Sequence, residues 1–175
     1  MERRRQFYGR RHGHKLRAGR QAHLQNLLPD IAIELTESAR ATLVPAELFS
    51  GSIRAVWLEI GFGGGEHLAW QAAANPDIGI IGCEPFVNGV AALCQKIDED
   101  RLNNVRLYTD DARVLLEALP DASIERLFVL FPDPWPKKKH HKRRIINPAP
   151  VGQFARILAD GGMLRVATDD LSYAQ

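Results

Sequence analysis

An acid and a tryptophan lie among alternating prolines in FPDPWPKKKHHKRR, residues 131–144. Proline fixes φ at about −65° and restricts the residue before it, so the turn should be stiff. A stiff turn can hold Asp133 and Trp135 in one geometry, as a catalytic or base-binding site requires. Lys137 to Arg144 then carry six fixed positive charges and two histidines. This favours a reaction site beside a polyanion, whereas a capping Asp and a packing Trp would suffice without the basic segment.

A glycine-rich segment, LEIGFGGGEHL at residues 58–68, is the second candidate for a binding site. Glycines let a backbone turn tightly and approach a ligand closely at a helix start. The nicotinamide fingerprint G-x-G-x-x-G is not met, because Glu66 occupies its third glycine position, where an anion would repel a pyrophosphate. The segment therefore favours a nucleotide-like ligand other than a dinucleotide.

Apolar runs alternate with helical periodicity from residue 55 onward. Buried strands are expected over 55–60, 78–83, 105–108, 124–131 and 163–167. Helices are expected within 36–49 and over 66–74, 87–101, 112–119 and 150–158. Such alternation predicts an α/β, doubly wound, mostly parallel sheet with right-handed crossovers and both faces covered. In such sheets, ligands bind beyond the carboxyl ends of the strands.

The spacing Glu59-x-Gly61-x-Gly63-x-Gly65 resembles the first motif of class I methyltransferases, which have a Rossmann-like sheet and bind S-adenosylmethionine. This cofactor carries a sulfonium, an ammonium and a ribose diol, which carboxylates suit as acceptors. Glu84 ends the second expected strand, nineteen residues after Gly65, and is placed to accept the ribose hydroxyls. Asp111, after the third strand, can accept the adenine amino group.

A more specific resemblance comes from FPDPW followed by a Lys/Arg-rich run, which is similar to the signature of bacterial tRNA (guanine-N7-)-methyltransferases. The order of the other motifs agrees: a basic N-terminal arm, LEIGFGGGEHL, GCEPF, DDA, FPDPWPKKKHHKRR and ATDD. The resemblance implies methyl transfer from S-adenosylmethionine, with S-adenosylhomocysteine as product, to N7 of a guanine in the variable loop of tRNA (position 46). It also implies that the cofactor and reaction site is lined by Glu59, Glu84, Asp111 and Asp133, and that the substrate is contacted by Lys137 and Asp169.

The implied reaction suits these residues. Guanine N7 is a bare acceptor with no proton to lose, so catalysis reduces to positioning and electrostatics. Asp133 would stabilise the positive charge that develops on the base, and Trp135 would stack on a base. The basic segment, including Arg143 and Arg144, would bind tRNA phosphates together with the arginines of the N-terminal arm.

Charge is unevenly distributed along the 175 residues. Residues 1–20 have a net charge of +7, and the remainder has −5, giving +2 in all. Residues 1–25 lack periodicity and are expected to form a flexible basic arm before a methyltransferase domain over 26–175. A polyanion such as tRNA is the indicated partner, although a solvated tail would have the same composition. No protein partner is indicated.

The sequence also predicts a cytoplasmic protein. No apolar run approaches the roughly 20 residues that cross a bilayer, and no apolar core follows Arg3, Arg4 and Arg5 as it would in a signal peptide. Cys83 and Cys94 have no metal-binding spacing, so we expect buried reduced thiols and no metal site.

Two alternatives remain open. Methyltransferases of exocyclic amines use an Asp/Asn-Pro-Pro-aromatic turn at this place, but here Trp135 lies between two prolines. A non-catalytic RNA-binding protein could also retain the fold.

Class I sheets normally continue past the fifth strand into a helix and two more strands, and the guanine-N7 family carries a Thr-x-x-Glu-like substrate motif near its C-terminus. Because the sequence stops at Gln175, we expect a sheet truncated after strand five with an exposed edge.

Overall fold

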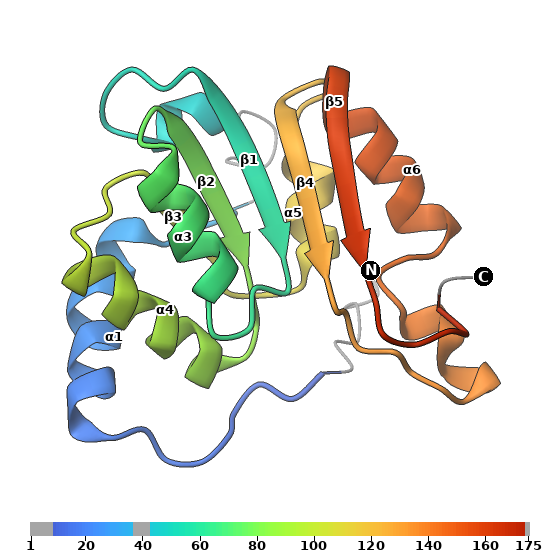
Figure 1. Cartoon of the computed structure of the whole chain (residues 1–175), viewed down its shortest axis with the longest axis horizontal. Coiled ribbons are helices and arrows are strands. Elements are labelled where there is room, and N and C mark those ends of the chain that lie inside the picture. Colours follow the sequence, from blue (N-terminus) through green and yellow to red (C-terminus); the bar gives the residue numbers. More distant parts are fainter. Residues whose placement is uncertain (1–8, 37–42, 174–175) are drawn as a thin grey trace.

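Five parallel strands form the centre of the molecule (Figure 1), a computed structural model that describes residues 9–36 and 43–173. The strands lie in the order β3-β2-β1-β4-β5, and every neighbouring pair is parallel. Their bounds are β1 Ala55–Ile60, β2 Ile78–Cys83, β3 Val105–Tyr108, β4 Ile124–Leu130 and β5 Leu158–Ala167. The apolar, β-branched runs form strands because residues on both faces of an inner strand are buried under helices.

Helices cover both faces of this sheet. They are α1 Ala18–Ile31, α3 Glu66–Ala74, α4 Val87–Glu99, α5 Ala112–Ala118 and α6 Pro148–Ile157. Two short 3₁₀ helices are η1 Pro45–Leu48 and η2 Lys138–Arg143. One apolar cluster joins α1, α3 and α4 to one sheet face, and a second joins α5 and α6 to the other face (Figure 1).

The strand order reverses at β1, which pairs with β2 on one side and with β4 on the other. The chain therefore adds β2 and β3 on one side of β1, and then crosses over to add β4 and β5 on the other side. The crevice beyond the carboxyl ends of β1 and β4 is the topological switch point, where ligands bind in open α/β sheets.

The predicted α/β class is confirmed, and so are the strands at 55–60, 78–83 and 105–108. The predicted helix within 36–49 is wrong for residues 43–49, where a single 3₁₀ turn forms at Pro45–Leu48; residues 37–42 lie outside the described residues. β5 begins at Leu158, earlier than predicted, because Leu158 already pairs with Ile124; the pairing then resumes at Met163 with Arg126, after an irregularity that contains Gly161 and Gly162. Both cysteines are free and buried, as expected.

The expectation of an arm without secondary structure over 1–25 is wrong for residues 18–25, which form the first turns of α1. This helix was missed because polar residues and small residues together occupy most of its positions. Its few apolar residues, Leu24, Leu27, Leu28 and Ile31, share one face and pack into the core cluster. Residues 1–8 lie outside the described residues. Across the described part of the chain, no helix combines the length and the apolar character needed to span a membrane.

Candidate functional site

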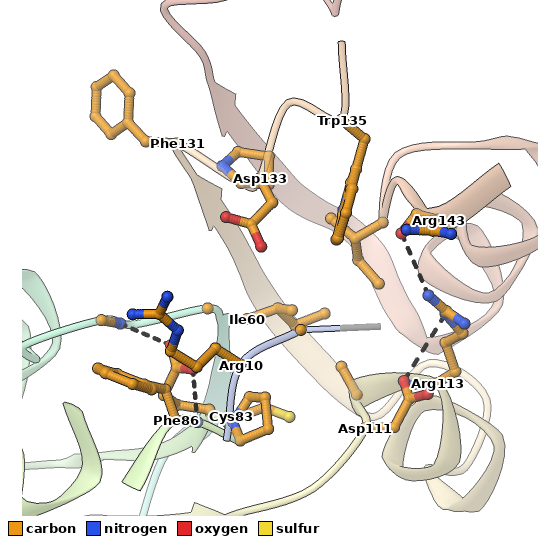
Figure 2. Close-up of a pocket in the computed structure, with 18 residues that line it drawn as sticks. Arg10, Ile60, Cys83, Phe86, Asp111, Arg113, Phe131, Asp133, Trp135 and Arg143 are labelled. Atoms are coloured by element: carbon orange, nitrogen blue, oxygen red, sulfur yellow. Dashed lines mark hydrogen bonds and ion pairs between the residues drawn. The ribbon is translucent and has the colours of Figure 1, made fainter. Parts of the chain in front are cut away.

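A cavity of about 470 Å³ lies at the carboxyl ends of β1, β2, β3 and β4 (Figure 2). Its wall combines the loop after β1, the end of β2, the start of α5, the proline turn after β4 and the arm before α1. The residues that line the cavity include Arg10, Gly61, Gly63, Glu84, Asp111, Asp133, Trp135 and Arg143. The structure therefore brings together the two candidate segments, although about 70 residues separate them along the chain.

The glycine loop forms the floor nearest β1. Gly61 and Gly63 line the cavity and have φ of 76° and 55°, in the left-handed region that costs glycine least. Gly65 caps α3 and packs instead against Leu93, where an added Cβ would lie 2.7 Å from Leu93 Cδ1. Gly61 and Gly63 can therefore approach a ligand, while Gly65 serves helix packing.

Glu84 joins this loop to the end of β2. Its Oε2 accepts the N–H of Gly63 at 3.0 Å, and its Oε1 accepts the N–H of Phe86 at 3.0 Å. Burial raises the pKa of the Glu84 carboxyl, the two backbone hydrogen bonds oppose the increase, and the charge of Asp133 adds to it. Each oxygen retains a free lone pair, so the carboxylate can accept further hydrogen bonds from a ligand diol.

Asp111 presents an unused acceptor. Its Oδ1 caps α5 by accepting the N–H of Arg113 at 3.0 Å. Its Oδ2 is buried and accepts no hydrogen bond from residues 9–36 or 43–173. Because a buried acceptor without a partner is costly, this oxygen indicates a donor group that a ligand would supply.

The proline turn after β4 presents Asp133 and Trp135. Asp133 is exposed, and Figure 2 shows its carboxylate pointing into the cavity. The Arg143 guanidinium lies 5.0 Å from the centre of the Trp135 ring, and the His140 ring meets it edge-on at 5.9 Å. The turn is strained, because Trp135 has φ 43° and Phe131 has φ 50°. Non-glycine residues in this region persist only where their surroundings hold them.

Glu59 lies elsewhere. Its carboxyl is buried under α3, where Oε2 is 2.7 Å from Nδ1 of His67, and it is absent from the cavity wall. Successive residues of a strand point to opposite faces, so Ile60 reaches the cavity and Glu59 does not. Burial raises the pKa of Glu59, and the contact with His67 opposes the increase. Glu59 therefore lies outside the wall of this cavity, and its role toward the cofactor stays a prediction.

The predicted substrate residues divide into three groups. Trp135 and Arg143 line the cavity. Lys137 and Asp169 are exposed and lie outside its wall. Arg144 is only 7% exposed and donates hydrogen bonds inside the protein, so its placement does not suit a contact with RNA.

The arm before α1 contributes residues that the sequence did not single out. Gly9 and Arg10 line the cavity. Arg11 O accepts the N–H of Val87, and Gly13 N–H donates to Oδ1 of Asn88 at 2.8 Å. The arm is thereby fixed to the start of α4, and no local pattern in the sequence predicts such a contact.

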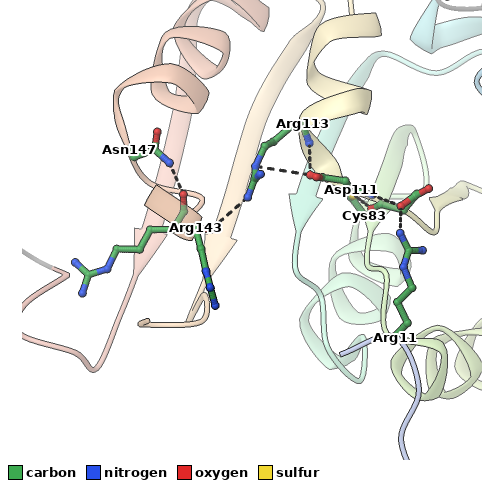
Figure 3. A network of polar contacts seen from close by, with 8 residues as sticks. Arg11, Cys83, Asp111, Arg113, Arg143 and Asn147 are labelled. Carbon is green, nitrogen blue, oxygen red and sulfur yellow. Dashed lines mark hydrogen bonds and ion pairs between the residues drawn. The ribbon is translucent and has the colours of Figure 1, made fainter. Parts of the chain in front are cut away.

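A polar network connects the arm to the basic segment (Figure 3). Arg11 pairs with Asp110, whose Oδ1 also accepts the N–H of Asp111 at 2.8 Å. The network continues through Arg113. Its guanidinium lies 3.8 Å from the Asp111 carboxylate and donates a hydrogen bond to the carbonyl oxygen of Arg143 at 3.3 Å. The two basic regions are thus held on opposite sides of one cavity.

Comparison with known proteins identifies the family. Residues 54–175 match a family model described as a putative methyltransferase. The tRNA (guanine-N(7)-)-methyltransferase of Rhodospirillum rubrum is 52% identical over 170 residues, 97% of this chain and 67% of the relative. Those of Paramagnetospirillum magneticum (52%, 95% of this chain, 70% of the relative) and Paracoccus denitrificans (47%, 98% and 75%) are similar. The chain belongs to the tRNA (guanine-N7-)-methyltransferase family.

Solved structures agree with the family's fold. A 30S ribosomal A1408 methyltransferase from an uncultured bacterium superposes with a TM-score of 0.55 at 17% identity, covering 81% of this chain and 65% of the other. A structure described as an antibiotic-related methyltransferase gives 0.52 at 18% identity, with 76% and 64% covered. At this identity, the likeness shows a Rossmann-like methyltransferase fold, as predicted.

Proposed function

We propose that the protein transfers the methyl group of S-adenosylmethionine to N7 of a guanine in tRNA. The observation that carries the proposal is a single cavity in which the glycine loop meets Glu84, Asp111 and Asp133 beside the start of the basic segment. Family membership supports the same reaction, because the relatives are named tRNA (guanine-N(7)-)-methyltransferases.

The cavity fits the methyl donor in size and in its acceptors. Its volume of about 470 Å³ lies within the range typical of small-molecule sites. Glu84 would accept the two ribose hydroxyls, because it lines the cavity at the end of β2 and each of its oxygens is already oriented by one backbone N–H, that of Gly63 or that of Phe86. The unpaired Oδ2 of Asp111 would accept the adenine amino group. Carboxylates here also attract a cationic donor.

When bound, S-adenosylmethionine supplies a methyl group whose bond to sulfur breaks as its bond to N7 forms, leaving a neutral thioether and a cationic guanine. N7 offers a lone pair and carries no proton, so none of the chain's side chains is required as a general base. Asp133 would lie beside the base, where its negative charge stabilises the positive charge that develops there. The stiff turn would hold that carboxylate in place before the substrate arrives.

The RNA would lie across the cavity mouth. Lys137, Lys142 and Arg143 extend from the basic segment, and Arg10 lies on the opposite wall. These cations would bind phosphates on either side of the target base, an interaction that weakens steeply with salt. Trp135 would offer its remaining ring surface to a base, because Arg143 lies over the ring and His140 against its edge. Asp169 would contact the substrate from the loop after β5.

Nucleoside analysis of the product tests this function. The protein is incubated with labelled S-adenosylmethionine and unmodified tRNA. The RNA is then digested to nucleosides, and the labelled nucleoside is identified by mass spectrometry. The proposal predicts 7-methylguanosine as the labelled nucleoside. A base methylated on an exocyclic amine would favour the rival methyltransferase class, and S-adenosylmethionine binding without any labelled nucleoside would contradict the proposed transfer.

A further inference from the structure

Arg144 differs from its neighbours in the basic segment. It is 7% exposed, whereas Lys142, two residues earlier, is exposed. Burying a guanidinium is costly unless its donors are satisfied. A buried cation at the end of a surface charge run therefore needs an explanation other than attraction for phosphates.

The guanidinium of Arg144 connects two separate segments. Its Nε donates to the carbonyl oxygen of Pro134 at 2.8 Å, within the proline turn. Its Nη1 donates to the carbonyl oxygen of Ser172 at 2.9 Å, and its Nη2 donates to the Ser172 hydroxyl at 2.8 Å. The same group stacks over the Tyr173 ring at 4.5 Å. One side chain thus ties the turn after β4 to the segment after β5.

The bond to Pro134 acts on a strained part of the backbone. The Pro134 carbonyl belongs to the peptide group that leads into Trp135, where φ is 43°. A left-handed conformation is unfavourable for a non-glycine residue and persists only where surrounding contacts enforce it. By fixing that peptide plane, Arg144 would help to hold Trp135 and the adjacent Asp133 in the geometry that faces the cavity.

The bonds to Ser172 extend to the acids after β5. The Ser172 hydroxyl accepts from Arg144 and donates to Oδ1 of Asp170 at 2.6 Å. This hydrogen bond lowers the pKa of Asp170, and the charge of Arg144 lowers it further. The fork of Arg suits several acceptors in fixed directions, which the single ammonium of Lys cannot reproduce.

We propose that Arg144 is a positioning residue for methyl transfer, which locks the Asp133–Trp135 turn against the segment 168–173, and is not a contact to RNA. The inference rests on the proposed function, because it assigns the turn to the reaction site. In the basic segment, exposed cations such as Lys142 would bind phosphates, whereas the buried Arg144 would position the reaction site.

The test compares Arg144→Lys and Arg144→Ala with Lys142→Ala, which removes a nearby exposed charge. The measurements are kcat with saturating tRNA and S-adenosylmethionine, and the Kd for tRNA across a series of salt concentrations. For both Arg144 variants we expect kcat to fall about tenfold to a hundredfold, because small misplacements of reacting groups have effects of this size. The Kd for tRNA should stay within about twofold, with an unchanged salt slope. Lys142→Ala should instead weaken tRNA binding and reduce the salt slope by about one unit.

Added guanidinium ions should partly restore kcat in Arg144→Ala and leave the wild type unaffected. If Arg144→Ala does not fold, Arg144→Lys and Ser172→Ala decide the matter, since each weakens the same connection and should lower kcat without changing the tRNA Kd. A weaker tRNA Kd and a shallower salt slope, as for Lys142→Ala, would overturn the inference, as would unchanged kcat. Absence of methyl transfer by the wild type would instead contradict the proposed function.

Discussion

The carboxylate of Glu84 accepts the backbone N–H of Gly63 at 3.0 Å, and so joins the end of β2 to the loop after β1. One side chain thereby orders the glycine loop and presents acceptors to the cavity. Loop geometry and ligand binding should consequently depend on the same carboxylate, and this connection gives the first prediction.

Replacing Glu84 by Ala should raise the Kd for S-adenosylmethionine at least about tenfold, since a hydrogen bond to a charged group contributes roughly 1.5–3 kcal/mol and 1.4 kcal/mol is tenfold in affinity. Calorimetry at fixed low salt measures the change. Glu84→Gln should bind more weakly than wild type as well, because an amide cannot accept on both sides. Wild-type affinity in both variants would show that Glu84 is not a ligand of the donor.

The approach of α4 to the glycine loop gives a second prediction. A Cβ on Gly89 would lie 2.2 Å from the carbonyl oxygen of Gly63, closer than real Cβ atoms come to backbone. Gly89→Ala must therefore displace either the loop or the start of α4. It should raise the Kd for S-adenosylmethionine strongly and lower the melting temperature only slightly. The matched control is Gly152→Ala in α6, where no atom lies within 4 Å of the new Cβ. That variant should bind normally and gain up to about 1 kcal/mol of stability. Equal binding by both variants would refute the prediction.

The half-buried carboxyl of Glu84 should make stability depend on pH in a particular direction. Its folded pKa is raised above the ordinary value of 4.5 for a Glu carboxyl, chiefly by burial, so the folded state binds this proton more tightly than the unfolded state does. The contribution of Glu84 is therefore most favourable below pH 4.5 and is lost as pH rises through the folded pKa. Urea unfolding of wild type and Glu84→Gln at several pH values isolates this effect. The free energy of unfolding of the variant, relative to wild type, should increase as pH rises through that window. A constant difference, or one that decreases, would argue against the burial effect.

Asn104 gives a prediction for the fold itself. It is 5% exposed, and its Nδ2 donates to the carbonyl oxygens of Ala72, Asn75 and Ile78 at 2.9–3.1 Å. Asn104→Ala leaves these acceptors near the end of α3 and the start of β2 without their donor, and should reduce the free energy of unfolding by about 1–3 kcal/mol. The exposed neighbour Asn103 provides the control, and Asn103→Ala should change stability by less than about 0.5 kcal/mol. Denaturant unfolding of the two variants makes the comparison, and similar losses in both would count against this role for Asn104.

Sequence patterns predicted β1 and β2 well, because each is a short apolar run followed directly by a glycine or an acid. Residues 56–60 and 78–83 are all buried, and their composition reflects that burial. The same reasoning failed for α1, where only one narrow face is apolar and the rest of the helix resembles a solvated arm.

Side-chain direction and tertiary burial are the features of the site that the sequence did not predict. Glu59 was expected at the cofactor site because the spacing Glu59-x-Gly61-x-Gly63-x-Gly65 resembles a methyltransferase motif, whereas alternation along β1 turns its side chain toward His67. Arg144 was grouped with its charged neighbours, yet contacts with Pro134 and Ser172, far apart in sequence, bury it. Glu84, Asp111 and Asp133 all line the cavity, because each lies within a few residues of the carboxyl end of a strand that the sequence also predicted.

The central claim, that this cavity delivers a methyl group to guanine N7, can be tested at a single atom. A tRNA is assembled with 7-deazaguanosine at the methylated position, which replaces N7 by C–H and leaves the Watson–Crick edge unchanged. Methyl incorporation from labelled S-adenosylmethionine is then compared with that into the same tRNA carrying guanosine. We predict incorporation into the guanosine tRNA and none into the 7-deazaguanosine tRNA, with similar Kd for both. Equal incorporation into the two tRNAs would contradict it, because the methyl group would then be going to another atom.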